Sequence, residues 1–188
     1  MTPTPTPGQT VGPFFHFALP YDGSADLVPS GHPGRVRLHG QVLDGAGDPV
    51  PDAVVEVWQT DPAGRVPQEP GSLHRDGWVF TGWGRAATDR TGRYSFSTLT
   101  PGPVVPGAAP YFALCLLGRG LTDRLLTRAY LPASGPEGSA ALAADPLLAA
   151  VEPGRRETLV ARRDRDGYVF DVRLQGEGET VFLRHDAR

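Results

Sequence analysis

Alternating apolar and polar positions recur in short segments along this chain of 188 residues. Successive side chains of a β-strand point to opposite faces, so a period of two predicts strands with one buried face. Strands are predicted at 35–43, 54–59, 78–82, 94–98, 111–117 and 125–131. A closing meander is predicted over 159–163, 168–175 and 180–183. The pattern therefore predicts an all-β fold, an antiparallel β-sandwich with long loops and little helix.

Turn residues punctuate these segments. Residues 44–51 read DGAGDPVP, and Asp89, Thr91 and Gly92 make a second turn before the strand at 94–98. Glycine supplies a positive φ, aspartate caps the turn, and proline fixes φ. The strand at 54–59 carries apolar side chains on both faces, which predicts a central position. Residues 140–150 are expected to form short helical turns broken at Pro146.

The amino-terminal segment differs from the rest of the chain. Residues 1–8 are rich in Thr and Pro and are expected to form an extended or disordered arm, because proline cannot donate to a ladder. Residues 9–188 are expected to form a single β-sandwich domain. Phe14, Phe15 and Phe17 need burial, either on their own sandwich or on the surface of another chain.

Composition and charge narrow the function classes. The net charge of −3 gives no electrostatic footprint for nucleic acid or an anionic membrane. Apolar residues make up 39% of the chain, as in ordinary globular proteins, without a basic-then-apolar leader or a run of about 18 apolar residues. One cysteine excludes an intramolecular disulfide and fits a reducing compartment, so we expect a cytoplasmic protein.

The reactive side chains form no evident catalytic or metal motif. The histidines are His16, His32, His39, His74 and His185, without an H-x-H or H-x-x-x-H pair. Cys115 lies in the apolar run 112–117 and is expected to be a small core residue rather than a nucleophile.

Six sequence blocks nevertheless follow one another in a specific order. They are QTVGPFFHF from Gln9, GQVLDGAGDPVPDAVVEVWQ from Gly40, TPGPV from Thr100, LLTRAYLP from Leu125, DPLLAAVEPGRRETLVARR from Asp145 and RDGYVFDVRLQGEGETVFL from Arg165. In this order the chain resembles the intradiol ring-cleaving dioxygenases, and most closely the α chains of their two-chain members. A strand-turn unit alone would be weaker evidence for this family, because prealbumin-like binding modules also carry the pattern D-x-x-G-x-P-V-x-x-A.

The resemblance also implies where a metal would be held. The catalytic chain of this family binds ferric iron with two tyrosines and two histidines. At the corresponding positions this chain carries Val66, Val104, Tyr111 and Ala113. Valine and alanine have no lone pair to donate, so we expect no metal site in this chain. Tyr111 and Ala113 are interpreted as core fill, with a relict ligand pocket opened by the small Ala113 as the alternative.

A metal-free chain of this family is expected to work through a partner. The resemblance implies a homologous catalytic β chain that carries Fe(III), αβ protomers in a higher oligomer, and an active site near the contact between the chains. It implies ring cleavage of protocatechuate with O₂ to 3-carboxy-cis,cis-muconate. It further implies that Arg128, Thr10, Gly12 and Pro13 of this chain line the pocket of the partner, with Gly12 serving mainly the turn.

Arg128 is the strongest of these candidates. A planar, always-charged guanidinium suits the carboxylate of the substrate. An ordinary strand arginine paired with a surface carboxylate is the other interpretation.

Two other functions for the chain also stay open at this point. A prealbumin-like binding module would leave QTVGPFF and RLQGEGETVFL unexplained, and a self-sufficient dioxygenase would need the four missing ligands.

Overall fold

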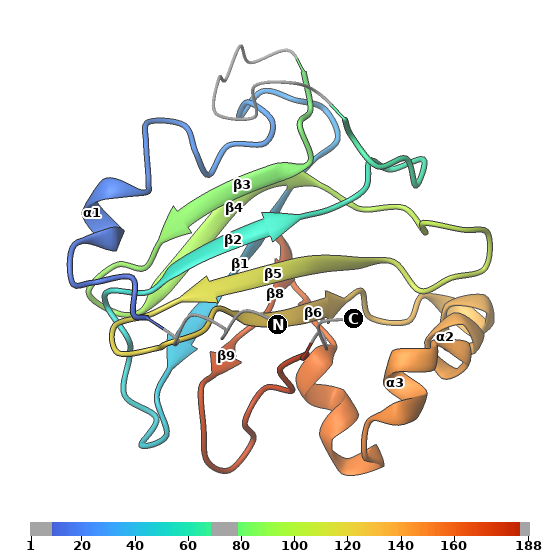
Figure 1. Ribbon diagram of the computed structural model, residues 1–188. Coiled ribbons are helices and arrows are strands. Elements are labelled where there is room, and N and C mark those ends of the chain that lie inside the picture. Colours follow the sequence, from blue (N-terminus) through green and yellow to red (C-terminus); the bar gives the residue numbers. More distant parts are fainter. Residues whose placement is uncertain (1–8, 69–78, 185–188) are drawn as a thin grey trace, which may run out of the picture.

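Two β-sheets packed face to face form the body of the molecule (Figure 1). The computed structural model describes residues 9–68 and 79–184, so the expected arm at 1–8 lies outside the described residues. The strands are β1 (Arg35–Leu43), β2 (Val54–Trp58), β3 (Trp83–Ala87), β4 (Arg93–Leu99), β5 (Tyr111–Leu117), β6 (Leu125–Tyr130), β7 (Arg162–Arg163), β8 (Gly167–Val169) and β9 (Val172–Arg173). The first sheet has the order β4-β1-β8-β7, with β9 also paired to β1, and the second has the order β3-β2-β5-β6. The predicted sandwich and the central position of β2 are confirmed.

Short helices lie at the two ends of the sandwich (Figure 1). α1 (Phe15–Ala18) is at one end, and α2 (Gly135–Ala144) and α3 (Pro146–Ala150) are at the other, followed by the 3₁₀ helix η1 (Pro153–Leu159). The predicted break at Pro146 is confirmed, because the side chain of Asp145 accepts hydrogen bonds from the first backbone amides of α3. No helix within residues 9–68 and 79–184 has the length and apolar character needed to cross a membrane.

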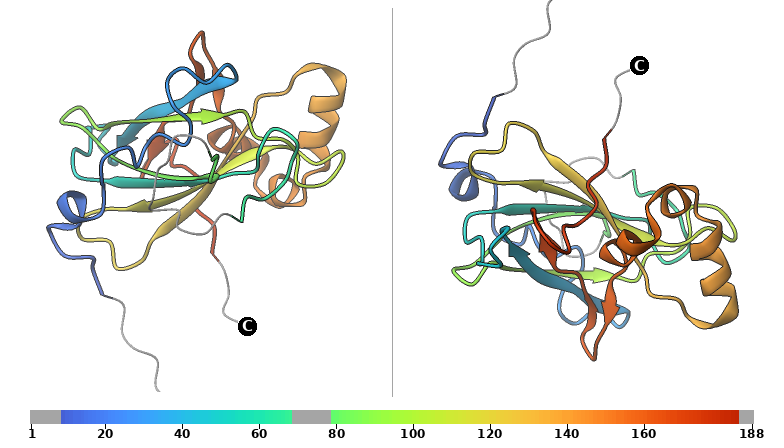
Figure 2. Two further views of the ribbon diagram at one scale, coloured as in Figure 1. Left: turned by 90° about the horizontal axis from the view of Figure 1, so that it is seen from above. Right: turned by 90° about the horizontal axis from the view of Figure 1, so that it is seen from below.

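The core lies between the two sheets, which Figure 2 shows as layers from above and below. Alternate residues of each strand point inward, as in Leu38 and Phe96 of the first sheet and Val57 and Leu114 of the second, all at most 2% exposed. The intervening residues of β2, β3, β5 and β6 point away from this core. They form what is called below the outer face of the second sheet.

The predicted strand at 78–82 is wrong. Trp78 lies outside the described residues, residues 79–82 form no strand, and the strand is β3, which pairs with β2 over its whole length. β3 reads WGRAA and has little of the β-branched character used for prediction. Gly84 packs directly against Leu27, and a Cβ at this position would require the end of the Leu27 side chain to move. Tertiary packing therefore places this strand against its local propensity.

The closing meander is only partly correct. β7 and β8 form an antiparallel hairpin, but β8 and β9 both run parallel to β1, and residues 180–183 contribute only the isolated bridge between Leu126 and Leu183. Gly40 in β1 lies against Phe170, which is between β8 and β9, and a Cβ on Gly40 would overlap the carbonyl oxygen of Phe170. The missing side chain lets the returning chain lie against β1.

The same kind of turn occurs four times among the residues that the structure describes. In each case an aspartate Oδ1 accepts hydrogen bonds from nearby backbone amides, and a glycine three residues later has φ between 71° and 149°. The pairs are Asp44 with Gly47, Asp61 with Gly64, Asp89 with Gly92 and Asp164 with Gly167. The predicted turns at 44–51 and 89–92 are confirmed, and both follow from the same physical cause.

Acid should weaken the turn at Asp89. Hydrogen bonds from the Thr91 side chain and from the backbone of Arg93 and Thr91 hold the pKa of Asp89 below its usual value of 3.8. A lowered carboxyl pKa stabilises the fold above the pKa of the unfolded state, and this contribution is lost as the pH falls through the folded value. We expect Asp89→Asn to be less stable than the unmodified chain at pH 7, and this difference to be smaller at an acidic pH below the usual carboxyl pKa of 3.8. Urea unfolding at both pH values measures the difference, and a difference that does not change with pH would contradict the expectation.

Candidate functional site

The four positions that the resemblance assigns to iron ligands gather around one hollow on the outer face of the second sheet. Val66, Val104, Tyr111 and Ala113 line this hollow together with Trp58 at the end of β2. Its volume is about 150 Å³, and its lining is mainly apolar. The loops that follow β2 and β4 lie at the end of the sandwich that carries α2 (Figure 1). The fold therefore brings together positions that are far apart in the sequence, as the resemblance implies.

Two glycines hold these two loops against each other. A Cβ on Gly64 would overlap the carbonyl oxygen of Pro103, and a Cβ on Gly102 would overlap the carbonyl oxygen of Pro62. The amide of Gly102 donates a hydrogen bond to the carbonyl oxygen of Asp61 at 2.9 Å. This close backbone approach places Val66 and Val104, which follow the two contact points, at the same hollow.

The donor atoms around the hollow do not fit a ferric ion. Three of the four corresponding side chains are aliphatic, and only the phenol of Tyr111 carries a suitable oxygen. The amide of Gln59 is already used, because it donates to the carbonyl oxygens of Thr60 and Leu99 and accepts from Thr98. Within residues 9–68 and 79–184, no group of three or more His, Cys, Asp or Glu side chains could hold a metal ion.

Arg128 lies in the cross-strand row that contains Trp58 and Ala113, so it shares the outer face with the hollow. Its guanidinium carbon is 4.1 Å from the ring centroid of Tyr111, and its Nη1 donates to the hydroxyl of Tyr130 at 3.0 Å. Arg128 belongs to none of the ion pairs found among the described residues. The interpretation as an arginine paired with a surface carboxylate is therefore not supported, and guanidinium donors remain for an anion.

The other predicted pocket residues lie away from Arg128 in the fold; they are Thr10, Gly12 and Pro13. Thr10 Oγ1 accepts a hydrogen bond from the amide of Gly12 at 3.3 Å, and Gly12 has a φ of 76°, which agrees with a role in the turn. Thr10 and Pro13 are exposed. The neighbouring residue Val11 lies with Gln9 beside the end of β5 at Leu117. That end is four residues, about 13 Å, from the row of Arg128, so no contact joins the two groups in the described chain.

Of the three amino-terminal phenylalanines, one is buried on its own sandwich and two are exposed. Phe15 is buried against Val54 and Leu117 on the outer face of the second sheet. Phe14 and Phe17 remain 71% and 75% exposed. Large apolar side chains are also exposed beside the hollow, namely Trp58, Val66 and Val104. Both regions have the character of surfaces that another chain covers.

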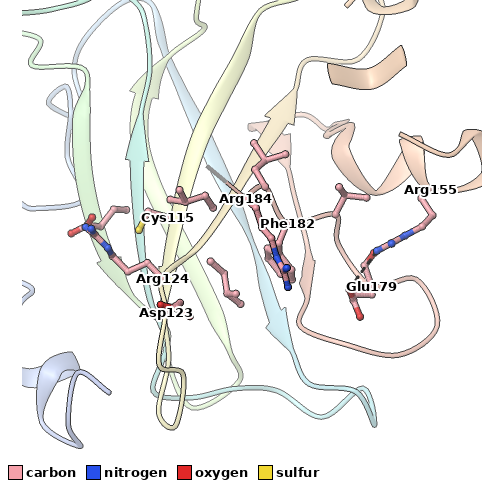
Figure 3. A pocket seen from close by; sticks show the side chains of 12 residues that line it. Cys115, Asp123, Arg124, Arg155, Glu179, Phe182 and Arg184 are labelled. Carbon is pink, nitrogen blue, oxygen red and sulfur yellow. Dashed lines mark hydrogen bonds and ion pairs between the residues drawn. The ribbon is translucent and has the colours of Figure 1, made fainter. Parts of the chain in front are cut away.

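A larger groove of about 860 Å³ opens on the same outer face (Figure 3). Figure 3 shows Arg155 and Glu179 paired at one side of it, where their nitrogen and oxygen atoms are 3.4 Å apart, and Cys115 at the other. Burial raises the pKa of Cys115 to about 11, so its thiol stays protonated at neutral pH. The expected role of Cys115 as a small buried residue is confirmed at 7% exposure.

Sequence reasoning missed two residues beside Arg128. The hydroxyl of Tyr130 accepts the hydrogen bond from Arg128 and donates one to Oδ1 of Asp145 at 2.9 Å. The R-x-Y spacing was an available signal, since residues i and i+2 of a strand share a face. Asp145 before Pro146 was another, because Asp followed by Pro is typical of the beginning of a helix.

Comparisons with known proteins agree with this geometry. A model of the dioxygenase family matches residues 11–176. The chain is 39% identical to the protocatechuate 3,4-dioxygenase alpha chain of Burkholderia cepacia, over 95% of this chain and 96% of that protein. It is 34% identical to the beta chain from the same organism, over 88% of this chain and 76% of that protein. Among solved structures, the fold is similar to that of a dioxygenase domain from Streptomyces sp. SirexAA-E, which is part of a fusion with a carbohydrate-binding protein. The TM-score is 0.56 and the sequence identity 25%, over 92% of this chain and 99% of that one. With this sandwich fold, the family match over residues 11–176 and 39% identity along 95% of its length to a member, the chain belongs to the intradiol ring-cleaving dioxygenase family.

Proposed function

We propose that this chain is the metal-free α subunit of a two-chain protocatechuate 3,4-dioxygenase of aromatic catabolism. One observation carries the proposal: the four ligand positions converge on one hollow, but they hold Val66, Val104, Tyr111 and Ala113. Similarity to both an alpha and a beta chain supports a homologous partner. That partner would hold Fe(III) and cleave protocatechuate with O₂ to 3-carboxy-cis,cis-muconate, and this chain would be inactive alone.

The exposed apolar side chains support assembly with such a partner. Phe14 and Phe17 form one exposed group, and Trp58, Val66 and Val104 form another at the hollow. Contiguous apolar surface of this kind commonly marks an interface between chains. We infer αβ protomers that associate further into a higher oligomer. A prealbumin-like binding module gives no reason for similarity to an α chain along 95% of this sequence.

The contribution of this chain to the active site is proposed to be the shape and charge of the substrate pocket. Arg128 would bind the ring carboxylate of protocatechuate, because a guanidinium fork matches a carboxylate and no carboxylate of the described chain forms a direct ion pair with it. Thr10, Gly12 and Pro13 are proposed to line the same pocket from their exposed segment. Oriented binding and exclusion of water are the expected gains.

Association with a catalytic chain tests this function. The partner to use is a homologous chain that carries the G-R-Y, G-P-Y and H-x-H motifs absent here. We expect the two chains, co-expressed and separated by size-exclusion chromatography, to elute together in equal amounts at a mass well above that of either chain. The chain should elute separately from an unrelated β-sandwich protein used as the control. Separate elution from every β homologue tried would favour a free-standing binding module instead.

A further inference from the structure

The guanidinium of Arg128 is held from two sides. The ring of Tyr111 supports its flat face, with the guanidinium carbon 4.1 Å from the ring centroid. The hydroxyl of Tyr130 accepts from Nη1 at 3.0 Å. A free arginine side chain has many rotamers and loses conformational entropy when it binds an anion. Each contact that already selects one rotamer reduces this entropic cost.

Tyr130 is itself fixed more firmly than Arg128. Its side chain is fully buried in a small cluster with Ala109, Leu148 and Leu159, and its ring centroid is 5.4 Å from that of Tyr111. Burial raises the pKa of Tyr130 to about 12, so the hydroxyl keeps its proton at neutral pH. It can therefore accept from Arg128 and donate to Asp145 at the same time.

Asp145 ends this chain of hydrogen bonds on a rigid element. Its Oδ1 accepts from the hydroxyl of Tyr130 at 2.9 Å, and from the amides of Leu147 at 2.9 Å and Leu148 at 3.0 Å at the beginning of α3. The same oxygen thus caps a helix and orients the tyrosine. A continuous path of hydrogen bonds runs from α3 through Tyr130 in β6 to the guanidinium on the outer face.

We propose that Tyr130 and Asp145 are positioning residues, which hold the guanidinium of Arg128 in the orientation that binds the carboxylate of the substrate. The inference rests on the proposed function, since it assumes that Arg128 binds this carboxylate. It adds that the segment 135–150, including α2 and α3, takes part in substrate recognition through Asp145. Without the tyrosine hydroxyl, Arg128 keeps its charge and its stacking on Tyr111 but loses its fixed orientation.

The test uses the αβ complex assembled with Tyr130→Phe in this chain. We expect the KM for protocatechuate to rise roughly three- to tenfold, the size of one lost hydrogen bond, while kcat changes little and the kinetics with catechol, which has no carboxylate, stay unchanged. In an Arg128→Ala background the same substitution should have no additional effect, because Tyr130 acts through Arg128.

Tyr168→Phe is the matched control. The hydroxyl of Tyr168 accepts from Nη1 of Arg163 at 2.7 Å, and the guanidinium of Arg163 lies over the same ring at 5.0 Å, but this pair belongs to the first sheet. It should lower stability without changing either KM. If Tyr130→Phe does not assemble, Asp145→Gly replaces it, since glycine is tolerated at the N-cap of α3 but removes the oxygen that accepts from Tyr130, and it should raise the KM for protocatechuate in the same direction.

The outcomes separate the two proposals. A large effect of Arg128→Ala together with no effect of Tyr130→Phe overturns the positioning role and leaves the proposed function intact. An equal effect of Tyr130→Phe on protocatechuate and catechol also overturns the positioning role, since it indicates a general structural change. No effect of Arg128→Ala itself overturns the assignment of Arg128 and the positioning role with it.

Discussion

Gly64→Ala is expected to lower the free energy of unfolding by roughly 2–5 kcal/mol and to open the hollow. Two costs add in this variant. Gly64 has a φ of 81°, a left-handed conformation that costs a residue with a Cβ about 1–2 kcal/mol. The new Cβ would also overlap the carbonyl oxygen of Pro103, and relief of such overpacking costs about 1–3 kcal/mol. Because this contact joins the loops of Val66 and Val104, the damage falls on the hollow itself.

Gly107→Ala separates these two costs. Gly107 has nearly the same φ, 82°, but a Cβ there would meet no atom within 4 Å. It should lose only the conformational cost of about 1–2 kcal/mol. Urea unfolding of both variants provides the comparison. Equal losses in the two variants would show that the close approach of the two loops contributes nothing to stability.

Arg128→Ala in the assembled enzyme is expected to raise the KM for protocatechuate roughly 10- to 100-fold. The range corresponds to about 1.5–3 kcal/mol for a hydrogen bond to a charged group. Catechol lacks the carboxylate, so its KM should change much less. The guanidinium occupies the outer face without a carboxylate partner in the described chain, and its loss should therefore cost binding rather than folding.

Arg163→Ala is the control for this substitution. Arg163 also lies over a tyrosine ring and donates to its hydroxyl, but it is in β7 of the first sheet. It should leave the KM values for both substrates unchanged. If Arg128→Ala changed protocatechuate and catechol equally, its role would be architectural, and a contact with the carboxylate would be excluded.

Local patterns predicted most of the fold because alternation and turn chemistry act within a few residues. β5 was placed at its observed bounds, and the turn at Asp89 and Gly92 has the predicted form. The position of β3, and the break that divides the predicted strand at 168–175 into β8 and β9, were not predicted, since they depend on contacts between distant residues. Gly84 faces Leu27, and Gly40 faces Phe170, and neither contact leaves a signal in its own segment.

Four of the residues that line the hollow were predicted, but the residues that hold Arg128 were not. The resemblance identified Val66, Val104, Tyr111 and Ala113, and the fold places them at one hollow. It did not indicate how Arg128 is held, because Arg128 donates to Tyr130 and Tyr130 in turn donates to Asp145, which lies in a different element of the fold. The segment around Thr10 lies away from Arg128 within this chain, so whether both line one pocket depends on a second chain.

The iron content of the purified chain tests the central claim most directly. Elemental analysis would be made on the chain alone and on its complex with the catalytic partner, each after exposure to iron and gel filtration, with ring cleavage of protocatechuate followed in the same samples. We expect the lone chain to hold no bound iron and to be inactive, and the complex to hold iron and to cleave the ring. Stoichiometric iron in the lone chain, or ring cleavage by it, would contradict the account.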